Sequence, residues 1–292
     1  MPFQLIISKD RPKVSIIIPS LDGIRDGNVS RLIEDIRRQS FQDYELILVK
    51  GESPNGHARN VGVRRAQGEI IVFIDDDAIL ANNKVIENLI LPFKKNQQVG
   101  MTGAAIDIPH DANWFQKLIP KDAFGGVSPV KQDREAYDEV QHTCCALPKR
   151  IYEFIGGEND HLVSGTDVDL RYRLKKDGYK IILAADCHVY HKLPDGPIKL
   201  WRQQFKFGFG TPLFMKECPE IVQLKKLKSP IHTFLFLAIK LLYALFSFFI
   251  TIRSKQGKRK LFFTFSPLGP LLTFPQDLGY VCGYYKLCRN KS

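Results

Sequence analysis

Apolar residues in the first third of the chain form short continuous runs that alternate with amphipathic stretches. Four runs rich in β-branched residues predict buried strands, at 14–20, 44–49, 70–74 and 99–106. Three stretches with apolar residues at helical spacing predict helices, at 28–40, 59–67 and 84–95. This alternation predicts an α/β fold: a doubly wound, mostly parallel sheet with helices on both faces.

The pattern is less regular further along the chain. Residues 109–137 are rich in Pro, Gly and Asp, so we expect loops there. The remaining elements expected before residue 192 are a short strand at 141–147, a helical turn at 150–155, a helix at 166–176 and a strand at 179–184. The first turn of the helix at 166–176 carries Asp167 and Asp169, which suit the positive end of a helix.

Residues 231–252 are almost entirely apolar and would form a helix of roughly 33 Å, long enough to cross a bilayer. Lys240 interrupts the run and forms a thin polar stripe with Tyr243, Ser247 and Thr251. Basic residues flank both ends, namely Lys225, Lys226, Lys228, Arg253, Lys255, Lys258, Arg259 and Lys260. Cations on both sides cannot orient a spanning helix. We therefore expect a helix in the plane of the membrane interface, or a re-entrant hairpin with 261–274; a core helix of a soluble domain is the alternative.

Charge divides the chain unevenly. The net charge is +11, yet residues 1–194 carry 26 Lys+Arg against 27 Asp+Glu, while residues 195–292 carry 16 against 4. A local excess of this kind favours an anionic membrane surface as the partner of the C-terminal region and argues against a nucleic-acid partner. We expect one domain at 1–215 and a basic, apolar membrane-associated region at 216–292.

The six cysteines show no CxxC spacing, so they are predicted to be reduced. Residues 1–11 lack a signal-peptide pattern. Together with the basic C-terminal region, these features place the protein at the cytoplasmic face of the cell membrane.

Three consecutive aspartates, Asp75, Asp76 and Asp77, follow the predicted strand at 70–74. In an open α/β sheet the ligand crevice lies at the carboxyl ends of the strands, so these carboxylates stand where a ligand binds. Adjacent carboxylates repel one another, and a divalent cation with oxygen ligands relieves that cost and brings a phosphate-bearing substrate. An acidic turn without a ligand remains the alternative.

Six motifs occur in an order that resembles family 2 glycosyltransferases of the GT-A fold over about residues 13–215. They are Val14-Ser15-Ile16-Ile17-Ile18-Pro19, Ala58-Arg59-Asn60-Val61-Gly62 with Ala66-Gln67-Gly68-Glu69, Phe73-Ile74-Asp75-Asp76-Asp77, Gly156-Gly157, Asp167-Val168-Asp169-Leu170 with Arg173-Leu174 and Gly178-Tyr179, and His191. The resemblance implies a nucleoside-diphosphate sugar donor and Mn²⁺ or Mg²⁺. It implies Asp167 as the catalytic base and a metal site of Asp75, Asp77 and His191. The residues expected at the donor are Pro19, Ser20, Asp22, Lys50, Arg59, Asp75 and Asp76.

The chain departs from the family pattern at three places. Lys50 stands where the family usually has an acidic strand end that reads the base, so the nucleotide is left open. Thr166 replaces the usual glutamate before the base. The QxxRW motif of processive synthases is absent, since Trp201-Arg202-Gln203-Gln204 has a different order, and this favours addition of a single sugar.

The sequence thus predicts an inverting, metal-dependent glycosyltransferase of polysaccharide biosynthesis, acting on a lipid-linked or envelope glycan acceptor. One alternative is a sugar-phosphate nucleotidyltransferase, although its phosphate loop is poorly matched by residues 22–27. Another is a non-catalytic membrane-bound sugar-binding module, which Asp167 argues against. Purely structural roles also remain open: helix capping for Asp167 and Asp169, packing for His191, and an exposed helix position for Arg59.

Overall fold

The computed structural model describes residues 3–120, 124–224, 227, 229–247, 251–255, 258–262 and 269–289. The chain forms two compact units. The first holds residues 1–111 and 121–193, and the second holds 112–120 and 194–292. The functional boundary expected at residue 215 stays a prediction, because a packing unit need not coincide with a functional domain.

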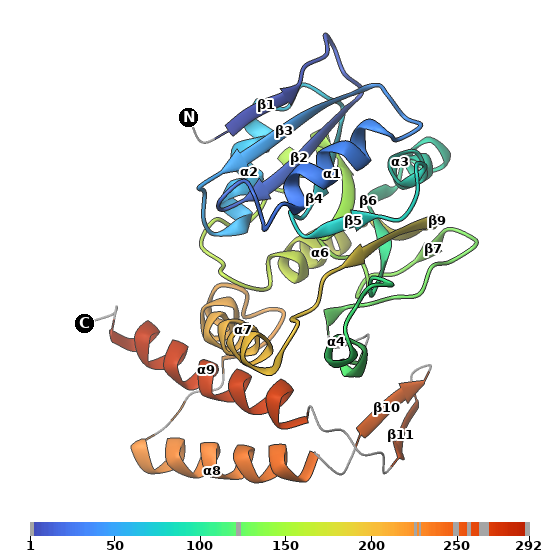
Figure 1. The fold of residues 1–292 in the computed structure, drawn as a ribbon. Coiled ribbons are helices and arrows are strands. Elements are labelled where there is room, and N and C mark those ends of the chain that lie inside the picture. Colours follow the sequence, from blue (N-terminus) through green and yellow to red (C-terminus); the bar gives the residue numbers. More distant parts are fainter. Residues whose placement is uncertain are drawn as a thin grey trace. The chain divides into compact units, whose positions relative to one another are not determined.

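The first unit is built on a nine-stranded sheet in the order β1-β3-β2-β4-β8-β6-β9-β5, with β7 also paired to β9 (Figure 1). Its strands are β1 Phe3–Ile7, β2 Val14–Ser20, β3 Tyr44–Lys50, β4 Ile70–Ile74, β5 Ala78–Leu80, β6 Val99–Asp107, β7 Arg134–Glu135, β8 Cys144–Pro148 and β9 Lys180–His191. The four strands expected in the first third of the chain are confirmed as β2, β3, β4 and β6. The two segments expected at 179–184 and 188–191 form one long strand, β9.

The sheet is mixed, so the expectation of a mostly parallel sheet is corrected. Pairing is parallel between β2 and β3, β2 and β4, and β6 and β9. β8 lies antiparallel between β4 and β6, and β1, β5 and β7 pair antiparallel near the edges. A crossover helix returns a strand in the same direction, as α3 does between β4 and β6. β8 instead follows the long connection after β6 and enters the sheet reversed.

Helices cover both faces of this sheet. They are α1 Asn28–Arg37, α2 Asn55–Arg65, α3 Val85–Lys95, α5 Lys149–Phe154 and α6 Thr166–Lys176. On one face α1 and α3 pack Leu32 and Leu89 into a cluster with Ile16 of β2. On the other, α2 and α6 pack Ala58 and Leu170 with Ile17 of the same strand. β2 is buried on both faces, which is why its sequence is continuously apolar instead of alternating.

Residues 109–137, expected to be loops, contain two short elements within the described part. β7 pairs with β9 in the first unit. α4 Trp114–Leu118 lies in the second unit and begins with a capping box, in which Asn113 and Gln116 bond each other's backbone N–H groups. That Asn-x-x-Gln spacing is a readable helix start, so this element was predictable from the sequence.

The second unit also contains α7 Pro197–Glu217, α8 Pro230–Ser247, the hairpin of β10 Thr251–Lys255 and β11 Lys258–Phe262, and α9 Gly269–Arg289. α7 and α9 approach each other very closely. A Cβ placed on Gly208 would lie 1.9 Å from the carbonyl oxygen of Gln276, and one on Gly279 would lie 2.2 Å from that of Phe205. The glycines therefore allow this close packing of the two helices.

α8 turns its polar side toward α9. Lys240 Nζ lies 3.2 Å from Asp277 Oδ1, and the Thr233 and Tyr285 hydroxyls are 2.8 Å apart. The described part of α8 also exposes six large apolar side chains, most of them on the side away from these contacts: Ile231, Phe234, Leu235, Ile239, Leu241 and Leu242. The helix expected at 231–252 ends at Ser247, and Thr251–Lys255 is a strand.

None of the helices in the described ranges is both long enough and apolar enough to cross a membrane. Lys225, Lys226 and Lys228 lie outside the described residues, as does 263–268 of the expected re-entrant segment.

The contact of Gly68 with β2 gives a test of this packing. A Cβ on Gly68 would lie 2.5 Å from the backbone nitrogen of Ser15 and 2.6 Å from the carbonyl carbon of Val14. Because backbone atoms cannot move aside cheaply, we expect Gly68→Ala to lower the free energy of unfolding in urea by about 1–3 kcal/mol. Gly196→Ala is the control, since nothing lies within 4 Å of its added Cβ. Equal stability of the two variants would contradict this packing.

Candidate active site

The three aspartates form a short loop at the carboxyl end of β4, between β4 and β5. The Asp75 N–H donates to the Thr143 carbonyl at 3.1 Å. The Asn28 side-chain amide, at the start of α1, donates to the carbonyls of Asp76 and Ala78 at 2.7 and 3.1 Å. β5 then pairs with the end of β9, with Ala78 opposite His191. Four separate segments therefore meet at this aspartate loop, defined here as Asp75 to Asp77.

Asp75 pairs with a buried arginine. Arg59 Nη2 donates to Asp75 Oδ1 at 2.7 Å, and the Arg59 side chain is 3% exposed. Burial disfavours the charged guanidinium, but Asp75 and Glu158 outweigh it and raise the pKa of Arg59. The guanidinium also lies over the Phe73 ring, 5.8 Å from its centroid. Arg59 is thus a fixed internal cation, and the alternative of an exposed helix arginine is excluded.

Asp77 lies between two positively charged or chargeable groups. Arg25 Nη2 is 2.7 Å from Asp77 Oδ2, and His191 Nε2 is 3.3 Å from Asp77 Oδ1. Burial alone would raise the pKa of Asp77, yet His191 and Arg25 hold it well below its usual range. Burial opposes protonation of His191, and Asp77 reverses this and raises the pKa of the imidazole. The other ring nitrogen, His191 Nδ1, is buried and has no hydrogen-bond partner among the described residues.

Asp76 is neutralised in a third way. The Ser20 hydroxyl donates to Asp76 Oδ2 at 2.7 Å, and Arg25 Nε is 3.5 Å from Asp76 Oδ1. Burial dominates, opposed by the Ser20 hydrogen bond, and raises the pKa of Asp76 to about 6. The middle carboxyl therefore takes up a proton more readily than Asp77 does, which lowers the repulsion within the loop.

The other residues expected at the donor lie at the ends of β2 and β3. Pro19 is buried in β2 opposite Val49 of β3. The Asp22 carboxylate accepts the N–H groups of Ile24 and Arg25 at 2.8 Å, and these bonds lower its pKa. The Lys50 stem lies against the same loop, because a Cβ on Gly23 would be 2.5 Å from Lys50 Cε. The structure thus brings Ser20 to the aspartate loop and Lys50 to the loop of Asp22.

Asp167 and Asp169 have different environments in the first turns of α6. Asp169 is buried, and its Oδ2 accepts from Arg173 Nε at 3.1 Å and Nη2 at 2.6 Å. Asp167 makes one longer contact, 3.3 Å to Arg171 Nη1, and its side chain is 28% exposed. The N-cap of α6 is Gly165, so neither carboxylate is the capping residue. Asp169 is structural, whereas Asp167 is available for chemistry.

Two sets of contacts tie the start of α6 to the aspartate loop. Arg171 donates to the Val140 carbonyl, three residues before Thr143, which binds the Asp75 backbone. On the other side, a Cβ on Gly56 of α2 would touch Thr166 and the Glu158 side chain. α2 is the helix that carries Arg59.

Three further residues around the loop were missed from the sequence. Arg25 is one, and three adjacent carboxylates are a signal that such a cation is needed. The others are His142 and Glu158, which are both buried with His142 Nε2 2.9 Å from Glu158 Oε1. Glu158 follows Gly156 and Gly157, whose positive φ values of 83° and 70° mark the tight loop that turns it inward. Cys144 and Cys145 are buried in β8, with their thiol pKa raised by burial, and are packing residues.

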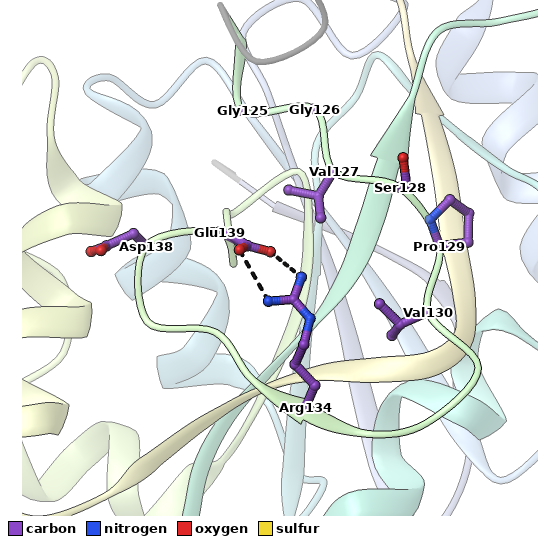
Figure 2. A pocket seen from close by; sticks show the side chains of 9 residues that line it. All are labelled: Gly125, Gly126, Val127, Ser128, Pro129, Val130, Arg134, Asp138 and Glu139. Carbon is purple, nitrogen blue, oxygen red and sulfur yellow. Dashed lines mark hydrogen bonds and ion pairs between the residues drawn. The ribbon is translucent and has the colours of Figure 1, made fainter. Parts of the chain in front are cut away.

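A hollow of about 570 Å³ opens beside this edge of the sheet. It is lined by residues 125–130 with Arg134, Asp138 and Glu139. Figure 2 shows Arg134 and Glu139 joined by paired hydrogen bonds on one side of it. Gly126 lines this hollow and also a small adjoining cavity that His191 and Asp107 share.

Asp75, Asp77 and His191 are the side chains expected to hold a metal. In the described parts of the chain, no three His, Cys, Asp or Glu residues are already arranged around a cation position. Asp77 and His191 are adjacent, while Asp75 faces Arg59. Carboxylate oxygen and imidazole nitrogen are suitable ligands for Mn²⁺, and His191 Nδ1 is a buried ring nitrogen without a hydrogen-bond partner among the described residues. The donor set therefore fits a divalent cation in its chemistry, with Asp77 and His191 in place.

Comparison with known proteins relates this chain to glycosyltransferases. A family model described as a glycosyltransferase-like family matches residues 27–147. The O-antigen chain rhamnosyltransferase WbaN of Salmonella anatum is 23% identical over 176 residues, covering 58% of this chain and 54% of that protein. The O-antigen chain rhamnosyltransferase RfbN of Salmonella typhimurium is 24% identical over 235 residues, covering 69% and 72%. These findings support a glycosyltransferase. The chain spans about half the length of the first of these relatives.

The fold is also found among solved structures. The mannosyltransferase PcManGT from Pyrobaculum calidifontis, solved with GDP-Man and Mn²⁺, superposes with a TM-score of 0.52 at 16% identity, covering 78% of this chain and 70% of that one. At this identity the likeness shows the fold: mixed α/β with a large central sheet and helices on both sides, similar to GT-A glycosyltransferases.

Burial of Arg59 predicts a large effect on stability. Arg59→Met would leave Asp75 without its cation and remove a positive charge that interacts with the buried Glu158, so we expect it to lower the free energy of unfolding by about 3 kcal/mol. Arg37→Met is the control, because Arg37 and Glu34 form an exposed pair, and its expected cost is below about 1 kcal/mol. Chemical denaturation of both variants measures the difference. A loss as small for Arg59→Met as for Arg37→Met would mean that Arg59 is not a structural cation.

Proposed function

We propose that the protein transfers a single sugar from a nucleoside-diphosphate sugar to a glycan or lipid-linked acceptor, with inversion at the anomeric carbon. The observation that carries this proposal is the contrast between two acidic groups at one edge of the sheet. The aspartate loop is closed in by cations and a histidine, while Asp167 makes a single long contact with the side chains of the described residues. The relatives named O-antigen rhamnosyltransferases favour an envelope glycan as the acceptor class.

The donor is proposed to bind along the ends of β2, β3 and β4. Ser20 and Asp22 would meet the nucleoside side, with Pro19 and Lys50 beside them, and Arg59 would hold the Asp75 carboxylate in position. Asp75, Asp77 and His191 would hold Mn²⁺ or Mg²⁺, which supplies positive charge to the leaving diphosphate. The solved neighbour with Mn²⁺ supports that choice of ion.

Asp167 is proposed as the general base. It accepts the proton of the acceptor hydroxyl as that oxygen forms its bond to the anomeric carbon, and the bond from that carbon to the diphosphate oxygen breaks. Attack from the face opposite the leaving group inverts the configuration. A partly exposed and weakly held carboxylate suits this role, since a carboxylate bound as tightly as Asp169 could not turn toward a substrate.

The acceptor is proposed to lie over the hollow lined by residues 125–130 (Figure 2). Ser128 and Asp138 offer oxygen atoms to sugar hydroxyls, and Gly126 connects this hollow to the cavity beside His191. An acceptor there would approach the donor from the side of β6 and β9.

The nucleotidyltransferase alternative receives no support from the loop after β2. Such an enzyme uses backbone N–H groups of this loop to bind phosphates. Here Asp22 already accepts the N–H groups of Ile24 and Arg25, so those donors are occupied by the loop's own side chain.

The activity is tested by nucleotide release. We expect the full chain with Mn²⁺ to release nucleoside diphosphate from at least one of a panel of UDP-, GDP- and dTDP-sugars. Asp167→Asn should lower kcat by about 10²-fold or more, because the base is lost, while donor affinity stays near the wild-type value. Asp177→Asn, at the other end of α6, is the control and should keep full activity. Undiminished turnover by Asp167→Asn would remove Asp167 as the base.

We further propose that the second unit binds an anionic membrane surface, which would place the enzyme on the cytoplasmic face of the cell membrane. The support is twofold: the six apolar side chains exposed on α8, and the balance of 16 basic to 4 acidic residues over 195–292. An apolar helix face with nearby cations is suited to the interface of an anionic bilayer. All six cysteines are free, as expected for a reducing compartment.

Vesicle flotation tests the membrane proposal with a matched pair of phenylalanines. Phe234 of α8 and Phe154 of α5 are 72% and 71% exposed. We expect Phe234→Glu to reduce binding to vesicles of phosphatidylglycerol and phosphatidylcholine about tenfold, since a buried phenylalanine contributes roughly 1.5–3 kcal/mol. Phe154→Glu should bind as the wild type does. Equal binding to pure phosphatidylcholine, or equal loss in both variants, would contradict the proposal.

A further inference from the structure

Arg25 has no role in the function proposed above, although it is a prominent contact of the aspartate loop. Its Nη2 lies 2.7 Å from Asp77 Oδ2, and its Nε lies 3.5 Å from Asp76 Oδ1. One guanidinium therefore bridges two of the three carboxylates. The Arg25 side chain is 52% exposed, whereas those of Asp76 and Asp77 are 16% and 17% exposed. Arg25 thus covers the loop from the solvent side.

The backbone holds Arg25 in this place at some cost. Arg25 and Asp26 have φ values of 45° and 53°, in the left-handed region that side chains other than glycine rarely adopt. Asp22 fixes the turn by accepting the N–H groups of Ile24 and Arg25. Unfavourable backbone conformations persist where the surroundings impose them, and they are concentrated at functional sites. The loop is therefore shaped to present this guanidinium to Asp77.

Arg25 and Arg59 differ in how freely they can leave their carboxylates. Arg59 is buried under Asp75, and its departure would leave buried charges unpaired. Arg25 is half exposed on a loop, and water can solvate it when the pair breaks. A divalent cation bound to Asp77 would repel the guanidinium 2.7 Å from that carboxylate. Of the two arginines, only Arg25 can leave its carboxylate at low cost.

We propose that Arg25 is the resident counter-ion of the aspartate loop, that a divalent cation displaces it from Asp77, and that the released guanidinium then binds the diphosphate of the donor. This inference rests on the proposed function. Arginine presents donors that match two phosphate oxygens at once, so the diphosphate offers a partner in place of the lost carboxylate. Arg25 therefore opposes cation binding when no nucleotide is present and favours nucleotide binding once the cation is bound.

The two roles predict changes of opposite sign in one variant. Mn²⁺ binding to the full chain without nucleotide is measured by the electron paramagnetic resonance signal of free Mn²⁺. Binding of UDP, GDP and dTDP with saturating Mn²⁺ is measured by calorimetry, and the nucleotide that binds tightest is used. We expect Arg25→Gln to bind Mn²⁺ about tenfold more tightly and this nucleotide about tenfold more weakly than the wild type.

Two further variants serve as controls. Arg25→Lys retains the charge without the fork, so it should bind Mn²⁺ within about threefold of the wild type yet bind the nucleotide more weakly. Arg38→Gln, exposed at the other end of α1, should change neither affinity. If Arg25→Gln leaves either affinity unchanged, or shifts both in the same direction, the inference is overturned while the proposed function stands. If the wild type binds no Mn²⁺ in either experiment, this inference and the metal dependence of the proposed function fail together, and the nucleotide-release assay still decides the activity.

Discussion

Repulsion among three adjacent carboxylates is the constraint on which the first unit depends. The charge of each carboxylate is compensated in a different way. Asp75 pairs with a buried guanidinium, and Asp77 pairs with Arg25 and His191. Burial raises the pKa of Asp76 to about 6, although the hydrogen bond from Ser20 opposes this. The carboxylates therefore differ in how firmly their cations are held. Arg59 is buried and cannot leave Asp75, whereas Arg25 is half exposed and can leave Asp77. A site built in this way keeps its fold without a bound ion and can still exchange one of its internal charges for a ligand.

The antiparallel strand β8 brings further residues to the aspartate loop. In a parallel sheet every strand would finish at the aspartate edge, and only residues that follow a strand could reach it. β8 pairs antiparallel with β4, with Cys144 opposite Ile74, so β8 begins where β4 finishes. Thr143 and His142, which precede β8, are thereby brought to the aspartate loop and to Glu158. The mixed sheet therefore supplies the site with residues from both ends of its strands.

These contacts mark how far the sequence could predict the structure. Strands buried on both faces are readable because burial alone makes them continuously apolar, as in β2 and β4. Asp75, Asp77 and His191 were expected at a metal and Arg59 at the donor, and the structure brings Asp75 to Arg59 and Asp77 to His191. The direction of β8 was not predictable, because it depends on how a long connection returns, which no local pattern records. β1 and β5 are short edge strands with little periodicity. Arg25 has the appearance of a surface residue in a glycine-rich turn until the position of Asp77 is known.

In the second unit, the orientation of α8 also depends on a residue that is distant in the sequence. Lys240 lies in the middle of an apolar run, and its sequence context does not say whether the polar stripe faces solvent, lipid or protein. The deciding residue is Asp277, on a helix some forty residues later, which pairs with Lys240 and turns that side chain toward α9. That pairing orients the whole helix, because the side opposite Lys240 must then be the exposed one. An ion pair inside the unit thus helps to turn six large apolar side chains outward, where a bilayer surface would remove them from water.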